Sequence, residues 1–231
     1  MPFEQLVAAV PELADARRVY ARKPPAERRA AAEWAYDSDM AHDLFSRSAL
    51  ATGDAADADA GFDSGVVALA IDRLFAPALL TVGSLEYQCK RRDAAMAMFL
   101  TLTTLPAGEP DLDEIIDKAG RFLLDQNDNA NATHLYRAAT EAHRGVCDLW
   151  SGLSYCLGKA GQLDEAVATA RQALALNEDD SHVLNDLGWT LVLAEQYDEA
   201  RLVLERAVSL APEGYDLPRN NLKELERRLS L

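Results

Sequence analysis

The chain has 231 residues, with 23 Lys and Arg against 38 Asp and Glu, and its formal net charge at pH 7 is −15. This length is enough for one or two domains with a proper hydrophobic core. Because so acidic a chain repels phosphate backbones and anionic lipids, we expect neither nucleic acid nor a membrane surface as a partner.

The distribution of apolar residues disfavours two further classes of protein. The start, MPFEQLVAAVPELADARR, lacks the cationic region and apolar run of a secretory signal. No uninterrupted apolar stretch approaches the roughly 20 residues that a transmembrane helix needs. Cys89, Cys147 and Cys156 have no metal-type spacing and are predicted to be reduced, buried thiols. We therefore expect a cytoplasmic protein, and the frequent Ala, Arg and Asp point to a bacterial source.

A 34-residue register organises the chain. The element Gln-x-Asp-Glu-Ala occurs at residues 162–166 and returns at residues 196–200. Each unit of this length is predicted to form a pair of helices. The units are, in chain order, residues 42–75, 76–109, 113–146, 147–180 and 181–214.

The N-terminal part follows the register least well. Residues 1–41 are predicted to form loosely repeat-like helices, broken at Pro11 and at Pro24-Pro25. Residues 42–112 are predicted to be degenerate repeats, and the first of these units keeps few large apolar residues. The clear repeats begin at residue 113.

Residues 113–214 hold three units in which matching offsets carry matching residue types. In the last unit, the apolar positions from Ala200 to Ala211 follow the spacing of one helical face. Gly120, Ser154 and Gly188 share one offset, where a small side chain lets the two helices of a pair approach closely. Apolar side chains recur at three other offsets: Ile116, Trp150 and Leu184; Leu123, Leu157 and Leu191; Tyr136, Ala170 and Leu204.

These offsets resemble the signature of the tetratricopeptide repeat, in which apolar and small residues recur every 34 positions. The resemblance implies an all-α fold, a right-handed superhelical solenoid of antiparallel helix pairs with one concave and one convex face. Residues 215–231 continue the register for one helix. Their apolar face, formed by Leu222, Leu225 and Leu229, predicts a C-terminal capping helix.

No stretch of the sequence has the pattern of a catalytic, cofactor or metal site. The Asp-rich residues 53–63 and 125–131 lack the ligand spacing of a calcium loop and are interpreted as solvated turns. The four histidines have no zinc-binding spacing, and no phosphate loop, nucleophile elbow or dinucleotide fingerprint is found. We predict that the protein is not an enzyme and binds neither metal nor cofactor.

The resemblance also implies where a partner would bind. In this family, the fifth and ninth positions of each first helix line a groove that holds an extended peptide. The groove residues carried over to this sequence are Arg121, Ser151, Tyr155, Asn185, Trp189, Arg219 and Lys223, beside Asp117. An Asn amide can pair with a peptide backbone, an aromatic ring gives rigid apolar contact, and Arg or Lys can receive a carboxylate.

Two of these positions have an alternative interpretation. Trp189 either binds a partner or packs against the neighbouring helix, and both remain open. For Tyr155, packing is the favoured interpretation. The set departs from the Lys/Asn/Asn/Lys/Arg clamp with which related repeats hold a chaperone's C-terminal carboxylate.

The sequence predicts a non-enzymatic interaction module, such as a scaffold, adaptor or assembly factor, that binds a peptide or helix of another protein. A secretion-type chaperone of a bacterial export system is one alternative, because residues 83–106 resemble the first repeat of translocator chaperones. A regulatory subunit of an enzyme complex is another. Self-association also remains open.

Overall fold

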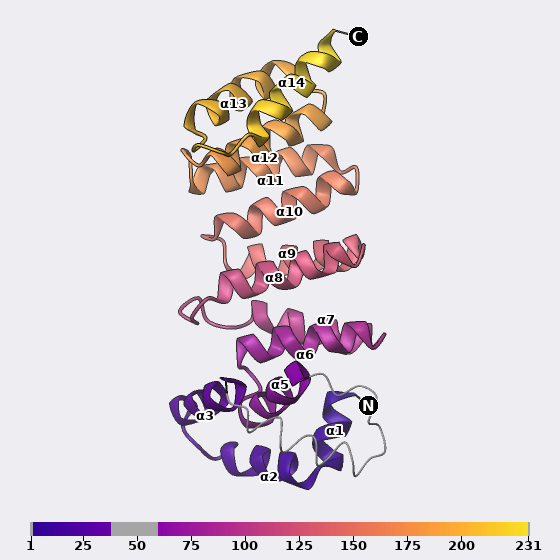
Figure 1. Cartoon of the computed structure of the whole chain (residues 1–231), viewed down its shortest axis with the longest axis vertical. Helices are drawn as coiled ribbons and strands as arrows, with labels where there is room; N and C mark the ends of the chain where they lie inside the picture. The colour runs from indigo at the N-terminus through magenta and orange to yellow at the C-terminus, as the bar shows by residue number, and fades with distance from the viewer. Residues whose placement is uncertain (1, 38–59, 231) are drawn as a thin grey trace. The chain divides into compact units, whose positions relative to one another are not determined.

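The computed structural model describes residues 2–37 and 60–230, which are helical apart from short connections (Figure 1). These ranges contain thirteen helices and no strand, so the predicted all-α fold of helix pairs is confirmed. The first seven helices are α1 (Phe3–Ala9), α2 (Pro11–Tyr20), α3 (Pro25–Asp37), α5 (Ala60–Ile71), α6 (Ala76–Gln88), α7 (Arg92–Thr103) and α8 (Leu112–Asp125). The others are α9 (Asn129–Ala142), α10 (Cys147–Lys159), α11 (Leu163–Leu176), α12 (Ser181–Leu193), α13 (Tyr197–Leu210) and α14 (Leu217–Leu229). None of the helices in the described ranges combines the length and apolarity needed to cross a bilayer.

The chain divides into two compact units, residues 1–119 and 120–231, and the boundary lies inside α8. The Asp-rich residues 53–63, interpreted above as a turn, fall largely outside the described ranges.

In the first unit, prolines start helices rather than interrupt them. Pro11 and Pro25 are the first residues of α2 and α3, where a missing backbone N–H costs nothing. The N-terminus is held by Glu86, a fully buried residue of α6 whose Oε1 accepts a hydrogen bond of 2.9 Å from the backbone N–H of Phe3. The guanidinium of Arg91 neutralises the same carboxylate, as a buried charge requires.

In the second unit, the helix pairs cross where the sequence has small residues. A methyl group added at Gly188 would lie 2.6 Å from the side chain of Leu204, so only glycine permits this approach of α12 and α13. Ser154 has room for a hydroxyl, which donates a hydrogen bond of 2.9 Å to the carbonyl of Ala166 on α11. The predicted role of the small residues at this offset is confirmed.

The 34-residue register extends to the backbone of the turns. Asn127, Gly161 and Glu195 each follow the first helix of a pair, and their φ angles are 57°, 75° and 58°. This left-handed conformation ends the helix and turns the chain back. The Asp-rich residues 125–131 form one such turn, in which Asp128 caps α9 by accepting from the backbone N–H of Asn131 at 3.3 Å.

The last helix, α14, covers the end of the second unit. Leu225 is fully buried in a cluster with Leu187, Leu191 and Leu204, and Leu222 packs against this cluster. Leu229 is 46% exposed, so the predicted apolar face ends one turn early, because the last turn of α14 lies beyond this cluster.

The three cysteines differ in exposure, which corrects the prediction that all are buried. Cys156 is buried and Cys147 is half-buried, whereas Cys89 is exposed. Cys89 directly follows the last residue of α6 and lies at its exposed C-terminal end.

Candidate functional site

The predicted groove residues of the second unit lie on its first helices. Arg121 is on α8, Ser151 and Tyr155 are on α10, Asn185 and Trp189 are on α12, and Arg219 and Lys223 are on α14. The structure brings several of them together around one carboxylate that the sequence did not single out, that of Asp186 on α12.

Asp186 has a pKa above its ordinary value, chiefly because the surrounding helices exclude water from its carboxylate. A hydrogen bond of 3.3 Å from the amide of Asn185 and the charges of His182 and Arg121 act in the opposite direction. The carboxylate of Asp180 raises the pKa further. The residue as a whole is exposed. Its carboxyl group is therefore partly desolvated by its neighbours and yet accessible to a partner.

A thiol and a phenol complete this group. The pKa of Cys147 is raised to about 11 by burial and by Asp148 and Asp180, and only the Ser151 hydroxyl opposes the shift. Burial and the carboxylates of Asp186 and Asp180 also raise the pKa of Tyr215. The Asp186 cluster therefore consists of Arg121, Cys147, Ser151, Asp180, His182, Asp186 and Tyr215.

Two rings of the Asp186 cluster lie against each other, one on α12 and one just before α14. His182 and Tyr215 lie with ring centroids 4.0 Å apart and an interplanar angle of 31°. The thiol of Cys147 donates to the carbonyl of Ala173 at 3.3 Å, and with its raised pKa it is protonated at neutral pH. A protonated thiol is a weak nucleophile, and here it acts as a hydrogen-bond donor.

Asn185 and Trp189 connect α12 to α14. Asn185 is only 2% exposed, and its Oδ1 accepts a hydrogen bond of 2.8 Å from the amide of Asn221. Trp189 is half-buried against the apolar cluster at the end of the unit, and the guanidinium of Arg228 lies 5.4 Å from its ring centroid. Of the two interpretations of Trp189, packing against a neighbouring helix is the one that these contacts favour.

Tyr155 is more exposed than the packed position that the sequence favoured. Its side chain is 55% exposed, and the Nζ of Lys159, from the same helix, lies 5.5 Å from its ring. This exposure favours the other interpretation, in which the Tyr155 ring is open to a partner.

The predicted cations of α14 are exposed. Arg219 forms an ion pair of 2.9 Å with Asp216, which cancels much of its field. Lys223 has no ion pair with any described residue.

The described residues contain no group of three or more His, Cys, Asp or Glu side chains that could hold a metal ion. Asp186, His182 and Tyr215 were not among the groove residues predicted from the sequence. The available signal was position: Asp186 follows Asn185, one turn after His182, on a first helix already assigned to the groove.

Comparisons with known proteins agree with this architecture. Residues 145–213 match the family model described as "Tetratricopeptide repeat". No curated protein matches the sequence at a significant level. Among solved structures, YrrB, described as a TPR protein with an unusual peptide-binding site, is 19% identical, with 80% of this chain and 89% of YrrB covered and a TM-score of 0.52.

Two further structures are similar at lower scores. The protein TTC0263 of Thermus thermophilus is 19% identical over 81% of this chain and 96% of its own, with a TM-score of 0.48. The first TPR domain of human RPAP3 is 18% identical over 52% of this chain and 94% of its own, also with a TM-score of 0.48. The family model shows tetratricopeptide repeats at residues 145–213, and the likeness to YrrB shows that the chain has the same fold.

Proposed function

We propose that this tetratricopeptide-repeat chain is a non-enzymatic interaction module that binds a peptide or helix of another protein along α10, α12 and α14. The observation that carries the proposal is the Asp186 cluster, an accessible but poorly hydrated carboxylate on the first helices. YrrB, whose fold is similar, is described as having a peptide-binding site. Repeat proteins of this kind use extended surfaces for binding.

The electrostatics of Asp186 favour a ligand that donates hydrogen bonds. Its carboxylate accepts the amide of Asn185 at 3.3 Å, near the outer limit of a hydrogen bond. A backbone N–H or a Lys or Arg of a partner would replace the missing water, and hydrogen bonds to a charged group are the stronger ones. We therefore assign Asp186 the role of anchoring a partner's donor group.

The other groove residues divide into two roles. Asn185 and Trp189 are occupied by contacts with α14, so we assign them the role of holding the binding surface in shape. Tyr155 offers an exposed aromatic face and Lys223 an exposed cation, and we assign both to direct contact with the partner. Aromatic side chains with few rotatable bonds are typical anchors of such contacts.

The test uses a photo-crosslinking amino acid placed at residue 155 in the full chain. The matched control places it at residue 202 on α13, a second helix, because Leu202 is even more exposed than Tyr155. We expect a partner to be captured from residue 155 and not from residue 202. Equal capture from both positions would contradict the proposed surface.

The captured partner then allows a binding measurement with purified components. Tyr155→Ala and Asp186→Asn should each raise Kd about tenfold, the effect of losing one anchor or one charged hydrogen bond. Leu202→Ala should leave Kd unchanged. If the first two variants bind as tightly as the parent, α10 and α12 are not the binding surface.

A further inference from the structure

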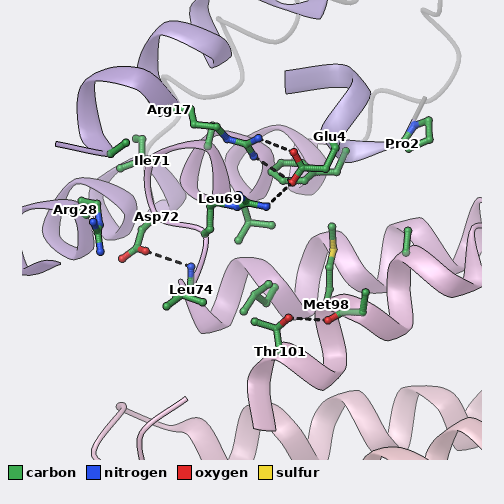
Figure 2. Close-up of a pocket in the computed structure, with 17 residues that line it drawn as sticks. Pro2, Glu4, Arg17, Arg28, Leu69, Ile71, Asp72, Leu74, Met98 and Thr101 are labelled. Atoms are coloured by element: carbon green, nitrogen blue, oxygen red, sulfur yellow. Dashed lines mark hydrogen bonds and ion pairs between the residues drawn. The ribbon is translucent and has the colours of Figure 1, made fainter. Parts of the chain in front are cut away.

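The first unit contains a cavity with a volume of about 670 Å³, open to solvent and lined by α1, α2, α5, α6, α7 and the start of α3 (Figure 2). Its apolar wall includes Phe3, Leu69, Leu79 and Met98, and the small Ala97 of α7 leaves the space unfilled. Cavities of this size and composition are typical of small-molecule sites. Nothing in the proposed peptide binding by the second unit uses this cavity.

Charged groups gather on one part of the wall. Arg17 donates to Glu4 at 2.6 Å (Figure 2). Arg73 donates to the same carboxylate at 3.1 Å. Burial alone would raise the pKa of Glu4, but the hydrogen bond and charge of Arg17 and the charge of Arg73 lower it. Glu4 is therefore ionised and already shared between two guanidinium groups.

Two polar groups of this wall lack a partner in the described residues. Arg28 lines the cavity without an ion pair in that part of the chain, and the Nε of Arg17 is buried without a hydrogen-bond acceptor. The other carboxylate of the wall, Asp72, accepts the backbone N–H of Leu74 at 3.2 Å. Three guanidinium groups thus face two carboxylates, which is an excess of one positive charge in a chain whose net charge is −15.

We propose that this cavity binds a linear alkyl carboxylate, with the chain against the apolar wall and the carboxylate on the guanidinium of Arg28. An oxygen ligand satisfies a guanidinium by charge-assisted hydrogen bonds. A peptide fits less well, because its amide groups need partners. Thr101, the hydroxyl residue of the lining, already donates to the carbonyl of Ala97 at 2.7 Å.

The test is calorimetric titration of the full chain with octanoate and decanoate, both below their micelle concentrations. Decanoate should bind about 15-fold more tightly than octanoate, because each buried methylene contributes about fourfold. Decanol should bind at least about tenfold more weakly than decanoate, since it lacks the charge. No binding of decanoate, or equal binding of decanol, would overturn the proposal.

Two pairs of variants locate the ligand. Arg28→Gln should weaken decanoate binding at least about tenfold, whereas Arg22→Gln, an exposed arginine outside the lining, should leave it unchanged. Ala97→Trp should abolish binding by filling the cavity, whereas Asp93→Trp, one turn earlier on the same helix and outside the lining, should not. Equal affinities within either pair would exclude this cavity as the site. Tighter binding of a tri-leucine peptide than of decanoate would overturn the alkyl assignment.

Discussion

The ring of Tyr136 is enclosed by two glycines on different helices, which allows a sharp test of the packing. Tyr136 on α9 is 1% exposed. A methyl group added at Gly120 on α8 would lie 2.3 Å from its Cζ, and one added at Gly152 on α10 would lie 2.4 Å from its Cε1. The ring cannot retreat from one glycine without approaching the other. Gly152→Ala should therefore overpack the core.

The loss of stability from overpacking is partly offset by the higher helix propensity of alanine. Overpacking a core costs about 1–3 kcal/mol, and we take the upper end because three ring atoms lie within 3 Å of the added methyl at Gly152. Replacing glycine by alanine in a helix interior also stabilises the helix, by up to about 1 kcal/mol. The expected net loss is about 2 kcal/mol, which lowers Tm by about 4–8 °C for a chain of this size.

The assay is thermal unfolding followed by circular dichroism. Gly158→Ala is the matched control, because it lies on the same helix and its nearest neighbour, Leu193 Cδ1, is 3.9 Å from the added methyl. This variant should be more stable than the parent by about 0.5–1 kcal/mol. If Gly152→Ala is stabilised to the same degree, the close approach of α10 to Tyr136 is refuted.

Three further predictions follow from burial and charge. Deleting residues 215–231 removes the fully buried Leu225 and uncovers its cluster, which should cost about 3–6 kcal/mol or cause self-association, measured by melting and light scattering. At pH 8, iodoacetamide should label Cys89 alone in the native protein. Burial raises the pKa of both Cys147 and Cys156 to about 11, so only about one thousandth of each thiol is ionised at this pH. Rapid labelling of two cysteines, seen by mass spectrometry, would contradict this prediction. The folded pKa of Asp186 is raised, so its stabilising contribution is present below its unfolded pKa and is lost as pH rises through the folded pKa. Asp186→Asn should therefore raise Tm at pH 7 and not at about pH 3. An equal effect on Tm at both pH values would exclude this cause.

The packing of the second unit could be predicted from the sequence because the same types of contact residue recur in each repeat. Gly120, Ser154 and Gly188 share one offset, and the structure places each where two backbones approach. A contact that recurs every 34 residues can be predicted without knowing the rest of the fold, since each helix pair contacts only its neighbours.

The candidate site could be predicted only in part, because its side chains do not recur. The offsets located Asn185 and Tyr155 on the first helices, but they carried no information on which side chain would be covered by α14. The pKa of Asp186 depends on residues that are far apart in sequence, because the charge of Arg121 on α8 lowers it. The cavity of the first unit was not predicted either, because α1 and α2 follow no repeat.

Asp186 is where the local rules of stability are broken, and this is the strongest reason to connect it with function. A solvated surface position would leave its carboxylate fully hydrated, whereas here neighbouring helices remove water and Asp180 adds repulsion. An asparagine would keep the hydrogen-bonding groups without the charge, and it is expected to be more stable at neutral pH. Groups that cost stability and remain accessible are typical of binding sites, where a partner compensates for the missing interactions. If the cost serves binding, Asp186→Asn must raise Tm and raise Kd for the captured partner together, whereas a purely structural carboxylate would change Tm alone.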